Sequence, residues 1–386
     1  MSEELDVLEP QEPDTPKETV PESKKPKKKK MKTWKKVLLI TLIVILSLTI
    51  IAAVGIFLWV NHLLNQINYD TTPDYTLSSE EVEQLEQENP DYVPVGDDED
   101  LDSMPSIEEL EQEIQKDPGI SAEPMPEGSV TGDIINILLI GQDRRGEKRA
   151  RSDSMILLTV NKDKNTITFT SFMRDAYVQI PGYKAHKLCH AFQYGGFSLL
   201  NETLWVNYGV RVDGNLEVDF NRFMDLIDLL GGVDIELTQK EVATMKGMGA
   251  GGDLKAGMNH LNGKQALAYS RIRYIDSDYA RAERQRTVLM SLLNEYKSKE
   301  LLEMIGLLED ILPLVTTNME KSDIWNLSYE VFPMVAGATI NTQQIPAHGT
   351  FKGGNVRVRE GLKGWFQYNI DFQKNREILQ NIFAGN

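Results

Sequence analysis

An uncharged stretch of 24 residues, 37–60, constrains this chain more than any other feature. About 20 apolar residues in a helix cross a bilayer core of roughly 30 Å, so the stretch predicts one transmembrane helix. A cleaved signal peptide has an apolar core of only about 7 to 15 residues, which disfavours that alternative. Nine lysines lie within residues 24–36, and positive charge marks the cytoplasmic side. The pattern predicts a single-pass cell-membrane protein with a cytoplasmic N-terminus and residues 61–386 outside.

The net charge of -17 is unevenly distributed along the chain. Residues 61–133 carry 21 acidic residues and one basic residue, whereas residues 134–386 are nearly balanced, with 30 Lys and Arg against 29 Asp and Glu. The lysine run before the membrane helix favours contact with anionic lipid rather than nucleic acid. The acidic residues 97–102 are an alternative metal-capture site, although such runs are usually just solvated. The chain divides into a disordered Lys-rich tail (1–36), the membrane helix (37–60), an acidic linker (61–130) and an extracellular domain (131–386).

Hydrophobic periodicity predicts an α/β fold for the domain. An apolar run at 134–140 ends at Gly141, as a buried strand would. Two β-rich runs at 155–160 and 166–172 predict a hairpin. Further helices are expected in the domain at 198–208, 220–230, 263–272, 280–297, 301–312 and 370–382, and strands at 233–237 and 339–345. Short helical patches at 79–87 and 107–115 are expected in the linker. This order predicts a mixed sheet with helices on both faces.

Two carboxylates stand beside the ends of predicted strands. Asp143 follows the first strand and Asp153 precedes the second, so the chain path brings both to one edge of the sheet. Two carboxylates, waters and phosphate oxygens make the octahedron that Mg²⁺ prefers. Acidic residues at such positions also form turns and caps, so position alone leaves both interpretations open.

Arginines gather between residues 271 and 286. The five are Arg271, Arg273, Arg281, Arg284 and Arg286. Residues 274–279 predict a loop, and Arg281 and Gln285 then share one helical face. The planar guanidinium grips phosphate oxygens in two places at once. The competing interpretation is a helix start held by ion pairs, such as Asp278 with Arg281.

Several strings, in this order and spacing, resemble the LytR-CpsA-Psr family. They are Gly141-Gln-Asp143, Arg151-Ser-Asp153-Ser-Met, Ser171-Phe-Met-Arg174-Asp175, Leu261-Asn-Gly263-Lys-Gln-Ala-Leu-Ala-Tyr-Ser-Arg271-Ile-Arg273 and Asp278-Tyr-Ala-Arg281-Ala-Glu-Arg284-Gln285. The likeness covers residues 134–300 well and the remainder loosely. Met173 departs from the family's frequent Pro, and Lys187-Leu-Cys-His190-Ala departs from its usual Lys-Ile-Asn-Ala-Ala. These departures concern the substrate's head group more than the phosphate chemistry.

The resemblance implies a three-layer α/β/α domain with a mixed central sheet, carrying a hydrophobic pocket for a polyprenyl tail and a pyrophosphate site at its mouth. It implies that Asp143 and Asp153 hold Mg²⁺ and, with Arg174, carry the catalysis. The residues implied to bind the pyrophosphate are Arg151, Arg174, Arg271, Arg273, Arg281 and Gln285, with Asp278 orienting the arginines.

The implied activity is transfer of an anionic glycopolymer, of teichoic acid or capsule type, from a polyprenyl-diphosphate lipid to a peptidoglycan sugar in a Gram-positive cell wall. An extracellular enzyme has essentially no ATP, so a donor already activated by its diphosphate bond suits this location. A pyrophosphatase acting on the same lipid would use the same residues. A third alternative, a non-catalytic transcriptional attenuator, is disfavoured because the cytoplasmic tail has no DNA-binding motif.

Other conspicuous residues predict no further chemistry. Cys189, the single cysteine, lies among apolar neighbours and predicts a buried thiol. Residues 247–252 contain four glycines but lack the Lys-Ser pair of a P-loop, so they predict a surface loop near the substrate entrance. Phe220 and Phe223 fit either the core or a lipid pocket. The histidines His186, His190, His260 and His348 show no metal-binding spacing.

Overall fold

The computed structural model describes residues 33–70, 75–88, 91–96, 99–100, 103–116, 125–126, 132–144, 149–273, 275, 278–331, 334 and 337–385. The chain forms two compact units, Met1–Leu58 and Trp59–Asn386. Helix α1 (Thr33–Leu64) contains a stretch, Ile40–Leu64, that is long and apolar enough to cross a membrane. The predicted disordered tail lies, except for its last residues, outside the described residues.

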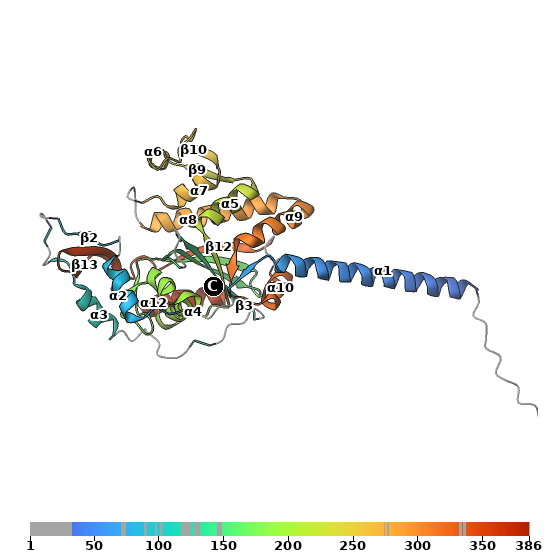
Figure 1. Cartoon of the computed structure of the whole chain (residues 1–386), viewed down its shortest axis with the longest axis horizontal. Helices are drawn as coiled ribbons and strands as arrows, with labels where there is room; N and C mark the ends of the chain where they lie inside the picture. The colour runs from blue at the N-terminus through green and yellow to red at the C-terminus, as the bar shows by residue number, and fades with distance from the viewer. Residues whose placement is uncertain are drawn as a thin grey trace, which may run out of the picture. The chain divides into compact units, whose positions relative to one another are not determined.

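A seven-stranded mixed sheet, in the order β1-β11-β8-β3-β4-β5-β12, forms the centre of the second unit. Figure 1 labels β3 and β12 of this sheet. Its strands are β1 (Asn68–Tyr69), β11 (Thr316–Thr317), β8 (Gly214–Asp219), β3 (Ile134–Gln142), β4 (Ser152–Asn161), β5 (Thr166–Phe172) and β12 (Thr339–Ile345). Strand β4 pairs antiparallel with β3 and β5, whereas β8 and β12 run parallel to their neighbours β3 and β5. The predicted hairpin is therefore confirmed as β4 and β5.

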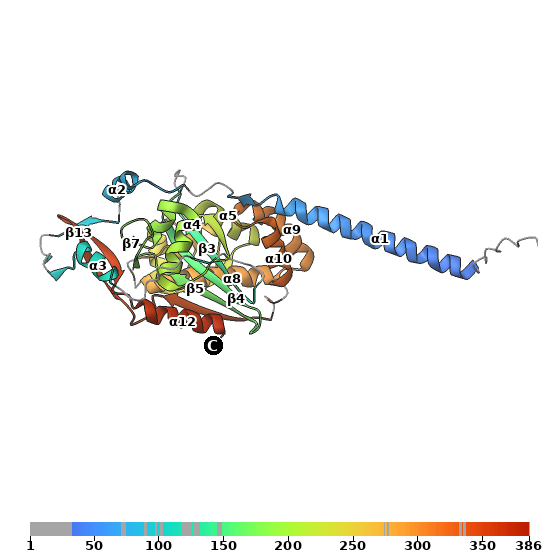
Figure 2. The ribbon, with the colours of Figure 1, turned by 90° about the horizontal axis from the view of Figure 1, so that it is seen from below.

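Apolar residues on both sides of the pleat place β3 between two layers of helices. Leu138 and Ile140 pack into one hydrophobic cluster, and Ile135 and Ile137 pack into another on the opposite face. The first face is covered by α4 (Cys189–Tyr208) and α12 (Phe372–Ala384), and the second by α8 (Asp278–Ser298) and α10 (Lys321–Glu330). Helix α12 lies beside β4 in Figure 2. These are the three layers expected from the sequence.

A third hydrophobic cluster lies on the far side of α8 from the sheet. It is built from α5 (Phe220–Leu230), α6 (Gln239–Gly247), α7 (Gly263–Ser270) and the hairpin of β9 (Val233–Leu237) with β10 (Gly257–Leu261). Helix α9 (Leu301–Ile311) and the short helix η2 (Leu312–Leu314) follow α8. Helices α5 and α7 approach closely at Gly263, where an added Cβ would lie 2.2 Å from the backbone oxygen of Met224. This contact fixes the first turn of α7, the helix whose C-terminal end is capped by Arg271.

Described parts of the expected linker belong to the core of the domain. Helices α2 (Ser79–Gln87) and α3 (Ile107–Ile114) begin with capping boxes at Ser78 and Ser106. Val82, Leu110 and Ile114 are buried in the same cluster as the sheet. Strand β2 (Val93–Pro94) pairs with β14 (Leu362–Tyr368), which pairs with β13 (Lys352–Arg359), and β6 (Tyr177–Val178) pairs with β7 (His186–Lys187). These helices are therefore part of the folded domain and not a plain spacer. The sequence does not reveal this, because the acidic composition conceals apolar residues at helical spacing.

Candidate functional site

Strand direction brings the predicted site residues to one edge of the sheet. Strand β3 ends at Gln142 and leads to Asp143, whereas the antiparallel β4 begins at Ser152 and carries Asp153 as its second residue. Strand β5 points the same way as β3 and leads to Arg174 shortly after its end. Two carboxylates and one guanidinium therefore arise at the same sheet edge from three adjacent strands.

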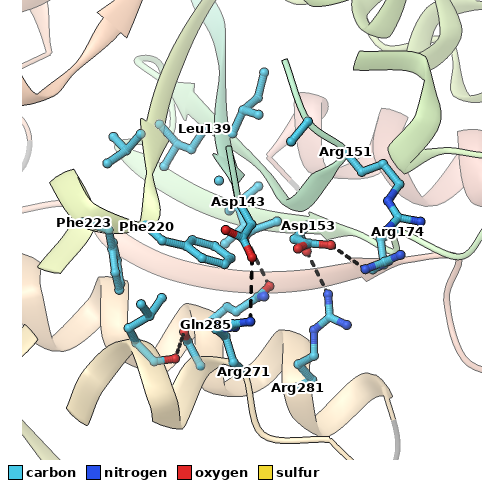
Figure 3. A pocket seen from close by; sticks show the side chains of 18 of the residues that line it. Leu139, Asp143, Arg151, Asp153, Arg174, Phe220, Phe223, Arg271, Arg281 and Gln285 are labelled. Atoms are coloured by element: carbon cyan, nitrogen blue, oxygen red, sulfur yellow. Dashed lines mark hydrogen bonds and ion pairs between the residues drawn. The ribbon is translucent and has the colours of Figure 1, made fainter. Parts of the chain in front are cut away.

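A cavity of about 770 Å³ lies at this edge. Its charged lining consists of Arg151, Arg174, Arg271, Arg273, Arg281, Asp143, Asp153, Asp91 and Glu88, and Gln285 also lines it. Its apolar lining includes Leu139, Ile156, Leu216, Val218, Phe220, Phe223, Leu226, Leu267 and Leu289. In Figure 3, the phenylalanines and Leu139 lie on one side of Asp143, and Arg151 and Arg174 lie on the other. The cavity is therefore amphipathic, charged at one end and apolar at the other.

Arg174 is the centre of the charged end. Its side chain is 6% exposed, and its guanidinium contacts the carboxylates of Asp153 and Asp91. Its Nε atom lies 3.4 Å from Oδ1 of Asp175, which is also 3.3 Å from Nζ of Lys187. Burial by itself would raise the pKa of Asp175, but the Arg174 and Lys187 charges hold that pKa below its ordinary value.

Helix α8 contributes Arg281 and Gln285 to the same cavity, as their spacing predicted. Arg281 Nη2 donates to the backbone oxygen of Asp153 at 2.8 Å, and the Ser154 hydroxyl donates to Gln285 Oε1 at 3.2 Å (Figure 3). Burial, together with the nearby charges of Arg273 and Arg174, lowers the pKa of Arg281 to about 10. Arg281 stays protonated at neutral pH while crowded by like charges, which favours a bound anion.

Arg271 stands where the charged and apolar ends meet. It caps the C-terminus of α7, and its side chain is 42% exposed. Its Nη2 atom lies 3.8 Å from Oδ2 of Asp143, and its guanidinium carbon lies 4.8 Å from the centre of the Phe220 ring. Asp278 begins α8, but its side chain lies outside the described residues, so its expected orienting role stays a prediction.

Two arginines of the predicted cluster point elsewhere. Arg284 Nε bonds Oε1 of Glu241 at 2.7 Å, and both residues are buried beside the third hydrophobic cluster. Arg286 Nη1 donates to the hydroxyl of Ser171 at 2.8 Å. Neither residue lines the cavity, so the ion-pair interpretation suits Arg284 and a structural hydrogen bond describes Arg286.

The two strand-end carboxylates of the cavity are the kind of ligand that Mg²⁺ prefers. Asp143 and Asp153 offer hard oxygen ligands from adjacent strand ends, and their side chains are 21% and 24% exposed. Among the described residues, no group of three or more His, Cys, Asp or Glu side chains is placed to hold a metal. Oxygens of a bound phosphate and water would therefore have to complete the coordination. The acidic run at 97–102 is only partly described, and there Glu99 pairs with Lys363.

A buried glutamine that sequence reasoning left without a role supports the loop between β3 and β4. Gln142 Nε2 donates to Glu217 Oε1 at 2.8 Å, and Gln142 Oε1 accepts from the Ala150 amide at 2.8 Å. Arg144 bonds the other Glu217 oxygen at 2.8 Å. These bonds tie the residues flanking Asp143 to the residue before Arg151. The string around Asp143 contains Gln142, but only the fold reveals its distant partner.

Several open interpretations are resolved by burial. Phe220 and Phe223 line the cavity, whereas Ile227, further along α5, is in the core. Cys189 is buried as predicted, and burial raises the pKa of its thiol to about 11. Met248 lines the cavity from the glycine-containing loop, and its side chain is 44% exposed, in keeping with a surface loop.

The fold and cavity define a mixed α/β protein with a site whose lining suits an anion attached to an apolar body. Residues 105–379 match the LytR_cpsA_psr family, and the chain belongs to that family.

Curated transferases from Bacillus species are similar to this chain. The chain is 31% identical over 276 residues to a polyisoprenyl-teichoic acid–peptidoglycan teichoic acid transferase, TagU, from Bacillus anthracis, covering 70% of this chain and 84% of the relative. It is 34% identical over 210 residues to the corresponding transferase TagT of Bacillus subtilis, covering 53% of this chain and 64% of the relative.

Solved structures of TagT share the fold. One, described as bound to LI-WTA, has a TM-score of 0.55 at 28% identity, covering 69% of this chain and 97% of that one. Another, with bound octaprenyl pyrophosphate lipid, has a TM-score of 0.52 at 27% identity, with the same coverage. The family resemblance noted in the sequence is thereby confirmed.

Proposed function

We propose that this chain is a membrane-anchored phosphotransferase that moves an anionic glycopolymer from a polyprenyl-diphosphate lipid to a sugar hydroxyl of peptidoglycan. The observation that carries the proposal is the amphipathic cavity, in which five arginines and two strand-end carboxylates meet an apolar wall. Diphosphate oxygens fit the arginines, and a prenyl tail fits the wall. The names of the relatives, and the lipid pyrophosphate described for TagT, support the same substrate class.

The reaction is a substitution at phosphorus. The acceptor hydroxyl oxygen attacks the sugar-bearing phosphorus, the bond to the bridging oxygen breaks, and polyprenyl monophosphate leaves. The acceptor proton passes to a carboxylate or to water. Such a reaction needs alignment and neutralisation of phosphate charge more than covalent help from the protein. Arg174, Arg271 and Arg281 supply positive charge to those oxygens, and Gln285 supplies a side-chain amide.

Asp143 and Asp153 would hold Mg²⁺ in this proposal. When bound, the ion would neutralise charge on the diphosphate oxygens and make the monophosphate a better leaving group. Asp153 also contacts the guanidinium of Arg174, so the same carboxylate that would bind the metal orients an arginine toward the phosphate. The positive charges of Mg²⁺ and of Arg174 would therefore act on the same diphosphate group.

Anchoring and orientation complete the proposal. Ile40–Leu64 would cross the cell membrane, with the lysine-rich N-terminus in the cytoplasm and the catalytic domain outside. An enzyme held there meets its lipid substrate in the outer leaflet without having to search the solution.

The proposal is tested by following release of polyprenyl monophosphate from a polyprenyl-diphosphate glycan by the full-length chain in detergent micelles. Release that depends on a peptidoglycan oligomer supports transfer. Release at the same rate without the oligomer would identify a pyrophosphatase instead. No release, despite tight lipid binding, would point to a non-catalytic role.

A further inference from the structure

A residue from the linker occupies the charged end of the cavity. Asp91 lies outside all the family-like strings, yet it lines the cavity with the arginines. Its Oδ2 atom lies 3.1 Å from Nη1 of Arg151 and also contacts Nη2 of Arg174. One carboxylate oxygen shared by two guanidinium groups reproduces the way these groups hold a phosphate oxygen.

The chain on both sides of Asp91 is docked on the domain. Upstream, Val82 of α2 is buried in the core. Downstream, the Tyr92 hydroxyl lies 2.7 Å from Nε2 of His186, and β2 pairs with β14 through Val93 and Pro94. The side chain of Asp91 can therefore leave the arginines by rotation while its backbone stays in place.

Linker carboxylates also change the charge of the cavity. Five guanidinium groups face the strand-end carboxylates Asp143 and Asp153, and the linker adds Asp91 and Glu88. Burial alone would raise the pKa of Asp91, but Arg174 and Arg151 hold it below its ordinary value. Asp91 is therefore ionised at neutral pH and competes with an incoming anion for the same donors.

We propose that Asp91 is an internal competitor for the diphosphate, holding Arg151 and Arg174 in the ligand-free protein until the substrate displaces it. The inference rests on the proposed function, since it takes these arginines as phosphate ligands. Displacement costs the site part of its affinity for any phosphate. The return of Asp91 to the arginines after transfer promotes release of the monophosphate product. Asp91 thus sets affinity and turnover at the site.

The test measures binding of inorganic pyrophosphate and of farnesyl diphosphate to the full-length chain in detergent micelles, by calorimetry with Mg²⁺ present. Asp91→Asn should bind both probes at least about fivefold more tightly, because a neutral amide competes less well for two guanidinium groups. Glu88→Gln is the matched control, because it removes the same charge from the same cavity. Glu88 accepts a hydrogen bond from Gln84, its neighbour on the α2 side.

The outcomes separate the inference from the proposed function. The inference alone is overturned if the wild type binds the probes but Asp91→Asn does not bind them more tightly. It is also overturned if Glu88→Gln gains as much affinity as Asp91→Asn. Weaker binding by Asp91→Asn would make Asp91 a residue that positions the arginines. Absence of binding by both wild type and variant would overturn the proposed function as well. Asp91→Ala, checked by thermal unfolding, replaces Asp91→Asn if the latter does not fold.

Discussion

The arginines of the cavity differ in their contacts, so removing each of them should affect activity and stability differently. Arg174 is buried among the carboxylates of Asp91, Asp153 and Asp175, so it supports the fold as well as the site. Arg271 is partly exposed and lies at a longer distance from Asp143. The sequence presents both as arginines in family-like strings. Only burial and partners distinguish an arginine that also supports the fold from one that is largely exposed in the site.

Arg271→Ala should lower transferase activity about tenfold or more, the loss of one charged phosphate contact, with little change in melting temperature. Arg174→Ala should lower activity and also destabilise the domain by about 3 to 5 kcal/mol, because it removes a buried guanidinium from the buried carboxylate of Asp175 and from the partly buried carboxylates of Asp91 and Asp153. Activity assays and thermal unfolding of the same preparations check both. Arg286→Ala, on α8 but outside the cavity lining, is the control and should keep its activity. Wild-type activity of the Arg271→Ala variant would show that Arg271 does not contribute to the reaction.

Asp153→Asn should raise the Mg²⁺ concentration needed for half-maximal activity by about tenfold or more, because the amide is a weaker ligand for a hard cation. A magnesium titration of the rate checks this. Asp163→Asn, an exposed change in the β4–β5 turn, controls for loss of charge. Full wild-type activity in excess chelator would rule out the metal assignment.

The buried carboxylate of Asp175 predicts a dependence of stability on pH. Its pKa is lower in the folded protein than its ordinary value of 3.8, so it stabilises the fold above about pH 4, and this contribution is lost as pH falls toward the folded pKa. Asp175→Asn should therefore melt below wild type at pH 7, with a gap that narrows as pH falls below about 4. Melting curves from pH 7 to 3 check this. A constant gap would contradict the assigned ion pairs.

At the scale of elements, strand direction and helix spacing carried most of the predictable information. The hairpin of β4 and β5 and the shared face of Arg281 and Gln285 follow from local periodicity. Helical periodicity predicts α2 and α3, but not their packing into the core, since the acidic composition of this segment indicates a solvated linker. The contact between α5 and α7 also escaped prediction, because a glycine's neighbour is set by tertiary packing.

Gly263→Ala should destabilise the domain by about 1 to 3 kcal/mol, because the new Cβ would lie 2.2 Å from the Met224 backbone oxygen. Arg271 should shift with α7, so activity should fall further than the loss of folded protein explains. Gly306→Ala in α9 is the control. Its Cβ would meet nothing within 4 Å, and alanine should stabilise that helix by about 0.5 to 1 kcal/mol. Chemical denaturation of both variants measures their free energies of unfolding. Equal values would contradict the close contact between Gly263 and Met224.

At the scale of the whole molecule, function depends on joining a membrane helix, a cationic edge and an apolar wall. The candidate membrane helix and the residues proposed to bind phosphate are readable from charge and motif. The wall is not, because Phe220 and Phe223 have the helical spacing of ordinary core residues, and only the cavity distinguishes them from Ile227. Asp91 was equally unpredictable, since one acid among many in the linker gives no signal until the fold brings it to Arg151 and Arg174.

The most direct test of this account is the mass of the product formed by the full-length chain in oxygen-labelled water. The reaction would contain a polyprenyl-diphosphate glycan, Mg²⁺ and a peptidoglycan oligomer. The account predicts a glycan joined to peptidoglycan through a phosphodiester without label, together with unlabelled polyprenyl monophosphate, because the acceptor hydroxyl and not water attacks phosphorus. Label in the released phosphates, with no joined product, would contradict transfer and establish hydrolysis.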